Sequence, residues 1–314
     1  MKKTCKDFLL FLLVSLFTSF VTYSQQYAFK VLTFSGNVEY RLPPVQMWTK
    51  VKTGEGLKNN FEIRLSDNSY AALLYNDGRT MEMTKEGIFN VGELEQIIKN
   101  SKMSVTQKFA KFVADEIIDD KSSGKTMKEF AAVVRVKPFH IETAIPTFTS
   151  VLEPTADLSW YSYPSTKIYI LSILNPENTT IFMELVEDTS YILDTDNLKL
   201  NRQTIYKWYV VDADNPKIAS DTNSITVLSE ANRKSILDTV QIYKEEAESD
   251  QYPLKILSLV AFYERNDLNE EALNQFTKVV ELAPESEEYK RLFTKFLLKN
   301  KLYVRASEFF KKNN

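Results

Sequence analysis

The chain has 314 residues, of which 44% are hydrophobic and 26% are charged, and its formal net charge is -3. Its one cysteine, Cys5, and one histidine, His140, exclude disulfide-built folds and zinc sites of cysteine and histidine, and they leave no basis for Cys–His or Ser–His catalysis. All seven glycines lie in the first 124 residues, and their spacing matches neither a P-loop nor a dinucleotide-binding loop.

Residues 1–24 have the features of a secretory signal peptide. Three lysines precede an apolar stretch over residues 8–21, which is shorter than the roughly 20 residues of a membrane span. A small residue follows at Ser24, where we predict cleavage; an uncleaved N-terminal anchor is the alternative. Cleavage removes three lysines and Asp7, so the mature chain has a net charge of -5 and no cysteine. We expect no transmembrane segment after cleavage and no binding to nucleic acid.

Residues 27–92 are predicted to form an all-β domain. Phe61, Ile63 and Leu65 alternate with polar residues, which is the period of a strand with one buried face. Asp77-Gly78 separates two apolar runs and predicts a hairpin between them. The pattern favours a small sandwich or barrel of short strands.

This segment also resembles a known family. The residues that carry the resemblance are Gly36, Val38, Trp48, Val51, Gly54, Leu57, 61–65, 68–71, Leu73 and Asp77-Gly78. Their order and spacing resemble the FecR-like domain of bacterial cell-envelope proteins. The resemblance implies a β-sandwich of jelly-roll type in a periplasm, and therefore a Gram-negative source. In iron-uptake regulators this domain follows an anti-sigma segment and a membrane span, whereas here it follows the signal peptide directly.

Residues 93–126 are predicted to be a helical connector and linker. Ser104 and Gln107 have the spacing of a capping box, and Phe109, Phe112, Val113 and Ile117 fall on one helical face. The polar segment 119–126 follows as a linker.

Residues 140–229 are predicted to form a second all-β domain. Turns are expected at 175–176, 194–197 and 212–216, and strands at 167–174, 180–185 and 224–228. Leu158 and Trp160 are expected to point inward, as are Tyr206, Trp208 and Val210. With Leu200 six residues before Tyr206, this pattern resembles the tyrosine corner of a fibronectin type III domain. The resemblance implies that the Tyr206 hydroxyl forms a hydrogen bond with nearby backbone.

Residues 230–314 are predicted to be helical with a 34-residue period. Ala272 and Ala306, Phe276 and Phe310, and Leu259 and Phe293 are each 34 residues apart, and Tyr263 and Pro284 complete one unit. This spacing resembles the tetratricopeptide repeat, with departures at Val260, Asp267 and Leu297. Because the segment holds about one and a half repeats, we expect its helices to pack on the β domain before them.

Several clusters have the composition of a functional site, and we favour an ordinary structural role for each. Paired carboxylates for a hydrolase occur at Asp115, Glu116, Asp119 and Asp120, at Glu184, Glu187 and Asp188, and at Glu245, Glu246 and Glu248. Oxygen ligands for calcium occur over residues 212–215, in the composition of an Asx-rich turn. His140 has no second histidine beside it. The segment 290–312 is strongly basic, because Glu308 is its one acidic residue. Those basic residues are Lys290, Arg291, Lys295, Lys299, Lys301, Arg305, Lys311 and Lys312.

The aromatic residues Trp160, Tyr161, Tyr163 and Tyr169 could stack on sugar rings if exposed in a row, although Trp160 is expected in the core, as is Trp48. We assign no catalytic, cofactor-binding or metal-binding residues, and no binding residues. The favoured function is a non-enzymatic periplasmic scaffold or adaptor that binds envelope proteins through its β domains and helical repeat. The alternatives are a glycan- or peptidoglycan-binding envelope protein and a regulator in FecR-type envelope signalling.

Overall fold

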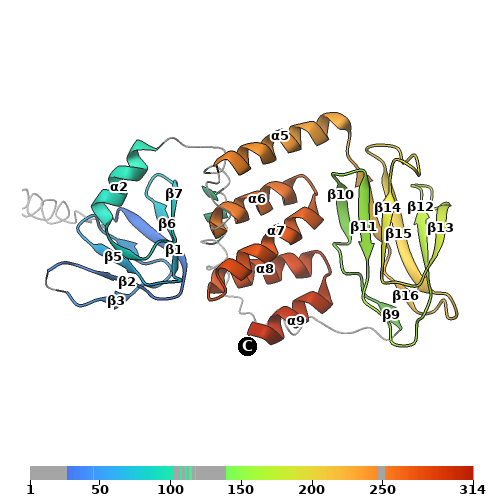
Figure 1. Cartoon of the computed structure of the whole chain (residues 1–314), viewed down its shortest axis with the longest axis horizontal. Helices are drawn as coiled ribbons and strands as arrows, with labels where there is room; N and C mark the ends of the chain where they lie inside the picture. The colour runs from blue at the N-terminus through green and yellow to red at the C-terminus, as the bar shows by residue number, and fades with distance from the viewer. Residues whose placement is uncertain are drawn as a thin grey trace, which may run out of the picture.

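The computed structural model describes residues 27–101 except Val45, then Gln107, Ala110, Lys111, Val113, Ala114 and Ile117, and then residues 139–246 and 252–313. The expected signal peptide, the Ser104 capping residue and the 119–126 linker lie outside these residues. The described part contains β-sheet domains and a C-terminal helical region, as predicted (Figure 1). None of its helices is long and apolar enough to cross a membrane.

The first β domain consists of two facing sheets. Their strands are β1 (Phe29–Ser35), β2 (Val38–Arg41), β3 (Thr49–Lys50), β4 (Gly56–Leu57), β5 (Glu62–Leu65), β6 (Tyr70–Tyr75), β7 (Thr80–Met83) and β8 (Gly87–Asn90). One sheet has the order β4-β1-β6-β7 and the other β3-β2-β5-β8. The expected alternation on β5 is confirmed, because Ile63 and Leu65 are buried. The expected hairpin is confirmed too: β6 and β7 pair on either side of Gly78, whose φ of 92° favours glycine.

Helix α2 (Val91–Asn100) completes this domain. The Asn90 side chain accepts hydrogen bonds from the backbone N–H groups of Gly92 and Glu93, which starts the helix directly after β8. Leu94 and Ile98 are buried in the same core as the sheets. The helix therefore begins earlier than the expected residue 93, and it belongs to the first β domain rather than to a connector.

The second β domain is a sandwich of a large and a small sheet. Its strands are β9 (His140–Ile141), β10 (Phe148–Val151), β11 (Thr155–Ser159), β12 (Tyr169–Leu174), β13 (Thr180–Val186), β14 (Ser190–Asp194), β15 (Ile205–Asp212), β16 (Ala219–Ser220) and β17 (Asn223–Val227). The large sheet follows the path β10-β17-β15-β12-β13, and the small sheet pairs β11 with β14.

The core of the second domain contains the residues that were expected to point inward. Leu158, Trp160 and Trp208 are buried between the sheets. The predicted hydrogen bond between the Tyr206 hydroxyl and nearby backbone is confirmed, because the hydroxyl accepts from the Asn201 N–H at 2.8 Å. The ring of Tyr206 is buried, so this bond satisfies a hydroxyl that would otherwise be partly desolvated.

The helical region contains α5 (Glu230–Glu246), α6 (Pro253–Arg265), α7 (Asn269–Leu282), α8 (Glu287–Lys299) and α9 (Tyr303–Asn313). The 34-residue period reappears in its geometry. The C-cap residues of α6 and α8 are Asn266 and Asn300, and the residues that follow them, Asp267 and Lys301, have φ values of 57° and 58°. Ala272 and Ala306 are both buried, whereas Phe310 is only half-buried.

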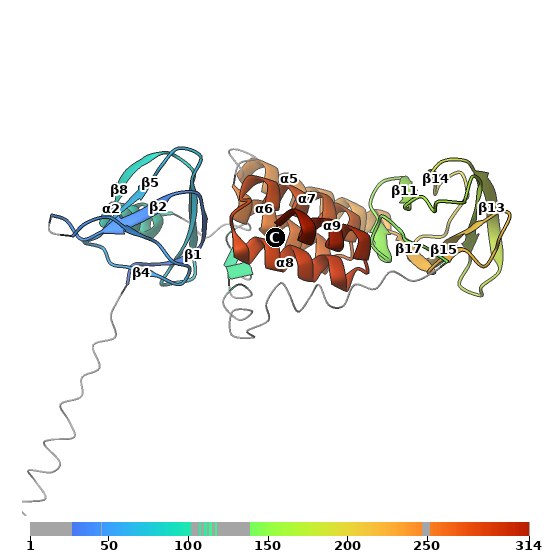
Figure 2. The ribbon, with the colours of Figure 1, turned by 90° about the horizontal axis from the view of Figure 1, so that it is seen from below.

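The helical region lies between the two β domains in both views (Figures 1 and 2). On one side, Leu32, Tyr70 and Ala72 of the first β domain share a core with the helices. On the other side, the Ser150 N–H donates to the Asp267 carbonyl at 2.7 Å, and the Thr147 N–H donates to that of Asn300 at 3.4 Å. The two equivalent helix–helix turns therefore both contact the segment around β10, in line with the expected packing on that domain.

Candidate binding surfaces

An exposed surface of the first β domain is centred on Trp48. We define the Trp48 surface as Arg41, Leu42, Met47, Trp48, Arg64 and Ile88. The guanidinium carbons of Arg41 and Arg64 lie 4.4 and 4.3 Å from the centroid of the Trp48 ring. Met47 is 86% exposed, and Ile88 on β8 is paired with Arg64 on β5.

The arginines of the Trp48 surface are already paired with carboxylates. Arg41 forms an ion pair with Glu62 at 2.8 Å, and Arg64 forms one with Glu39. The four residues occupy the outward positions of β2 and β5, because the alternate positions Val38 and Ile63 are buried. The surface is therefore a set of neutralised charges with apolar side chains among them.

Trp48 was expected in the core, and this expectation is wrong. The residue is only half-buried, and its ring lies over the outward-facing arginines of the sheet. A tryptophan side chain can be stable outside the core when cations cover its ring, because guanidinium groups are attracted to the ring face. One signal in the sequence could have indicated this position: Arg41 and Arg64 alternate with apolar residues along their strands, which places both arginines on the outward face of the sheet.

A second exposed surface lies on the large sheet of the second β domain. We define the outer β face as Ile170, Leu174, Ile181, Met183, Leu185, Tyr209 and Val211. The strand registers place Leu185 beside Ile170 and Ile170 beside Val211. Met183 and Leu185 are 60% and 64% exposed, so the edge strand β13 shows apolar side chains to solvent.

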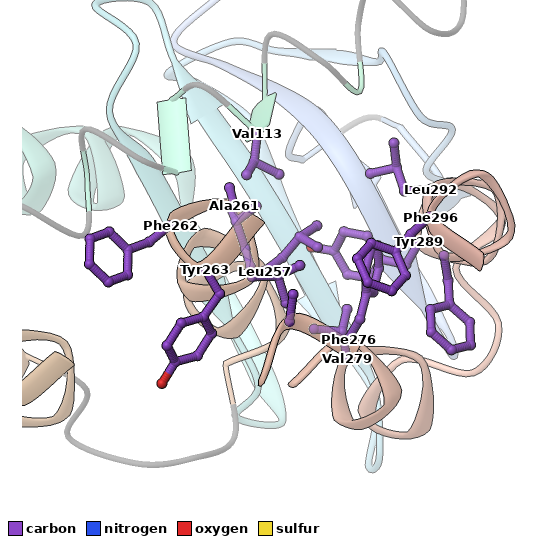
Figure 3. Packing of buried hydrophobic residues seen from close by; sticks show 14 of the residues in the cluster. Val113, Leu257, Ala261, Phe262, Tyr263, Phe276, Val279, Tyr289, Leu292 and Phe296 are labelled. Atoms are coloured by element: carbon purple, nitrogen blue, oxygen red, sulfur yellow. The ribbon is translucent and has the colours of Figure 1, made fainter. Parts of the chain in front are cut away.

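Residues that precede the second β domain in the chain partly fill the grooves between the helices. A cavity of about 100 Å³ lies between α6, α7 and α8, and Val113, which comes from before the second β domain, lines it together with Ala261 and Phe296 (Figure 3). Ala110, Val113, Ala114 and Ile117 are all buried in the same core as the helices. This includes the two described members, Val113 and Ile117, of the expected apolar face.

A wider cleft of about 520 Å³ lies where the helices meet the second β domain. Its walls include Phe148, Gln203, Ile205, Arg265 and Asn266. Nearby, the pKa values of Glu270 and Glu271 are raised to about 7, mainly by burial, with nearby carboxylates adding to the shift. Among the residues that the structure describes, no group of histidine, cysteine and acidic side chains could hold a metal ion.

The other sequence candidates are distributed over structural roles. The Asp212 carboxylate accepts hydrogen bonds from the N–H groups of Asp214 and Asn215 at 2.7 and 2.8 Å, which makes the segment an Asx turn. His140 begins β9, with its Nε2 3.6 Å from a Glu142 oxygen. The acidic residues at 115–120 and at 248 lie outside the described residues, and Glu184, Glu187, Asp188 and Glu245 are exposed.

The aromatic residues 160–169 do not form an exposed row. Trp160 and Tyr169 are buried, with ring centroids 5.4 Å apart, and Tyr161 and Tyr163 are half-buried. Two of the basic residues, both on α8, form ion pairs: Lys290 pairs with Glu287, and Lys299 pairs with Glu264, each at 2.9 Å.

A scan against protein-family models and a search of curated proteins found no match to this chain. Among solved structures, it is similar to a Fn3-like protein from Clostridium thermocellum at 18% identity, with a TM-score of 0.20, over 28% of this chain and 88% of that one. It is also similar to a beta-1,2-glucanase from Parabacteroides distasonis at 15% identity, with a TM-score of 0.24. That match covers 55% of this chain and 34% of the glucanase chain. At these scores, neither likeness bears on activity or ligands.

Proposed function

We propose that this chain is a non-enzymatic scaffold or adaptor of the bacterial cell envelope, exported to the periplasm, that binds another protein through its Trp48 surface. The observation that carries the proposal is the composition of that surface. Met47 projects into solvent beside Trp48, and two arginines lie against the indole ring. Aromatic residues, methionine and arginine are enriched in protein interfaces, and tryptophan and arginine are frequent hot spots.

The pairing of the arginines supports a protein partner. Since Glu39 and Glu62 already neutralise Arg64 and Arg41, the surface offers little net charge to an anionic polymer. The Trp48 ring is held against Arg41 and Arg64 of the sheet, which limits the conformational entropy that its side chain loses on binding. The family resemblances fit this function: a FecR-like first domain, a fibronectin type III-like second domain and tetratricopeptide-like helices would together form an envelope protein built for holding other proteins.

The proposal is tested with a photo-crosslinking residue at the position of Met47 in the full chain, expressed in its own bacterium. The captured protein is identified by mass spectrometry and purified, and its affinity for the mature chain is measured. We expect Trp48→Ala to weaken binding about tenfold or more, because it removes an interface tryptophan.

The matched control is Ile97→Ala, since Ile97 is 61% exposed on α2 and lies outside the Trp48 surface. It should leave the affinity unchanged. An affinity that Trp48→Ala does not change would contradict the proposal, as would recovery of the chain, with its leader still attached, from the cytosol.

A further inference from the structure

We propose that the second β domain is docked on the helical region through a proton-dependent contact, which is tight when Glu270 and Glu271 are protonated and loosens when both ionise. We define the α7 junction as β10, the turn after α6 and the first turn of α7, where these two carboxyl groups lie. The Trp48 surface belongs to the first β domain, so the α7 junction is independent of the proposed function and goes beyond it.

The α7 junction is less completely packed than the contact on the other side of the helical region. Leu32, Tyr70 and Ala72 of the first β domain belong to the apolar core of the helices, whereas most buried residues of the second β domain form a core of their own. Leu152 and Leu228, at the border of the second β domain, do reach the helical core. Beside them, the cleft of about 520 Å³ lies between the large sheet, α5 and the turn after α6. Domains joined by small, partly polar contacts can move relative to one another.

Hydrogen bonds from the first turn of α7 hold the junction closed. The Asn269 side chain donates to the Phe148 carbonyl at 2.9 Å, and the Glu270 N–H donates to the Thr149 hydroxyl at 3.3 Å. Both bonds join α7 to β10. Since Glu271 is the next residue of the same turn, docking brings two neighbouring carboxyl groups against the second β domain.

Carboxyl groups also approach from the side of the second β domain. Asp157 on β11 acts as a like charge on Glu270, and Glu153 acts in the same way on Glu271. Glu270 and Glu271 are themselves half-buried, and the Oε2 atom of Glu271 is buried without a hydrogen-bond partner among the described residues. An ionised carboxylate in such a place is costly, because it loses water and gains no opposite charge.

In the described part of the chain, the other titratable groups at the junction leave Glu270 and Glu271 without a positively charged partner. Arg233 on α5 is paired with Glu153 at 3.0 Å, and its Nε donates to a backbone carbonyl at 2.8 Å. Tyr263 on α6 stays neutral, since burial and then the charge of Glu271 raise its pKa to about 12. The N-terminal position on α7 favours ionised side chains, but this attraction is smaller than the cost of burying an unpaired carboxylate.

The direction of the pH dependence follows from these surroundings. Burial, with nearby carboxylates adding to it, raises the pKa values of Glu270 and Glu271 from 4.5 to about 7, although a hydrogen bond from its own N–H opposes the shift for Glu271. When the junction opens, both side chains enter water and return to their ordinary pKa values. The closed form therefore binds these protons more tightly. Its advantage is complete below about pH 4.5 and is lost as the pH rises through about 7.

The test is hydrogen exchange of the Ser150 amide in the mature full chain, followed by NMR between pH 5 and pH 7.5. This N–H reports the junction, because it donates across it to the Asp267 carbonyl at 2.7 Å. After correction for the intrinsic exchange rate, its protection should fall about thirtyfold or more over this range, since opening becomes easier as the two side chains ionise.

The double variant Glu270→Gln/Glu271→Gln should keep the Ser150 protection nearly constant with pH, because glutamine has the shape of protonated glutamate and does not titrate. Protection equal to that of the wild type at pH 5 shows that this variant is folded and docked. Glu281→Gln is the matched control: Glu281 is exposed on the same helix, outside the junction, and its substitution should leave the wild-type pH dependence unchanged.

A wild-type Ser150 protection that does not change between pH 5 and pH 7.5 overturns the proposal. A double variant that keeps the full pH dependence of the wild type overturns it too, since the proton would then be bound elsewhere, as on Glu82 at the other contact of the helical region. Neither result bears on binding through the Trp48 surface, which is measured with a different variant.

Discussion

At the scale of single residues, Glu82 on β7 connects the first β domain to the helical region. Its carboxylate accepts hydrogen bonds from the N–H groups of Leu254 and Lys255 at 2.8 and 3.0 Å, and from the Tyr70 hydroxyl at 2.7 Å. The N-cap residue of α6, Tyr252, makes no side-chain capping bond. A carboxylate from the first β domain therefore caps a helix that begins about 170 residues later in the chain.

Burial raises the pKa of Glu82 from its ordinary value of 4.5 to about 7, although the hydrogen bonds from Tyr70 and from the helix amides oppose the shift. The folded state therefore binds this proton more tightly than the unfolded state. The corresponding stability is present below about pH 4.5 and is lost as the pH rises through about 7. We expect the free energy of unfolding to fall between pH 5 and pH 8, by an amount on the order of 3 kcal/mol from Glu82.

The measurement is urea unfolding at a series of pH values. Glu82→Gln should flatten the dependence, because the amide does not titrate. Part of the slope should remain, since the pKa values of Glu270 and Glu271 are also raised to about 7 by burial. A variant with the full slope of the wild type would show that Glu82 does not bind the extra proton.

The environment of a single residue could be predicted from the sequence where it depends on neighbours close by in the chain. Tyr206 was placed correctly because the alternating pattern of its strand fixes its direction, and its hydroxyl reaches Asn201 only five residues away. Trp48 was placed wrongly because tryptophan is apolar enough for the core, and its position depends on Arg41 and Arg64 from two other strands. Composition alone does not show that cations will lie against its ring.

At the scale of elements, the 34-residue period is preserved in backbone geometry as well as in packing. After α6 and after α8, one residue adopts a left-handed conformation, and the next N–H returns to the helix: Leu268 donates to Tyr263 at 3.0 Å, and Leu302 donates to Leu297 at 2.9 Å. The side-chain amides of Asn266 and Asn300 also donate to carbonyls four residues earlier. Glycine is the residue that most easily takes this conformation, yet the chain uses Asp267 and Lys301.

Lys301→Gly is therefore expected to stabilise the protein by about 1 kcal/mol, because glycine adopts a positive φ without the steric cost that lysine carries. Lys301 is exposed, so few side-chain contacts are lost. The measurement is the midpoint of thermal or urea unfolding.

The control for this prediction is Lys278→Gly, at an exposed position inside α7, where glycine should cost about 1 kcal/mol. Opposite signs at the two positions would confirm the conformational explanation. Destabilisation by both substitutions would contradict it and would show that the side chain of Lys301 matters more than its backbone.

The sequence predicted the elements with a clear period and missed the short ones. β12, β13, β15 and β17 were found within two residues at each end, because apolar residues alternate along them or form a continuous run. β9 and β16 have two residues each, which is too few to show a period. β10 was also missed, because it is defined by its parallel pairing with β17 from a distant part of the sequence. The outer β face was not predicted, since the run 180–185 gives a strand but not which of its faces is left uncovered.

At the scale of the whole molecule, the first β domain and the helical region are joined through polar contacts as well as a shared apolar core. The Thr33 hydroxyl lies 2.6 Å from that of Ser286 and donates to Glu288 at 2.9 Å. The Gly36 N–H donates to Glu285 at 2.9 Å. These partners are about 250 residues apart in the chain, which is why local patterns predicted each domain but not how they dock.

This docking predicts that the first β domain and the helical region unfold together. The most direct probe is the pair of hydroxyls of Tyr70 and Tyr289, which lie 2.9 Å apart in a buried contact. A double-mutant cycle of Tyr70→Phe and Tyr289→Phe, measured by urea unfolding, should give a coupling energy of about 1 kcal/mol. In the control cycle Tyr289→Phe is replaced by Tyr206→Phe, whose hydroxyl bonds within the second β domain, and the effects should add. Additive effects in both cycles would mean that the hydroxyl contact contributes nothing to the junction, and two separate unfolding transitions would mean that the parts fold independently.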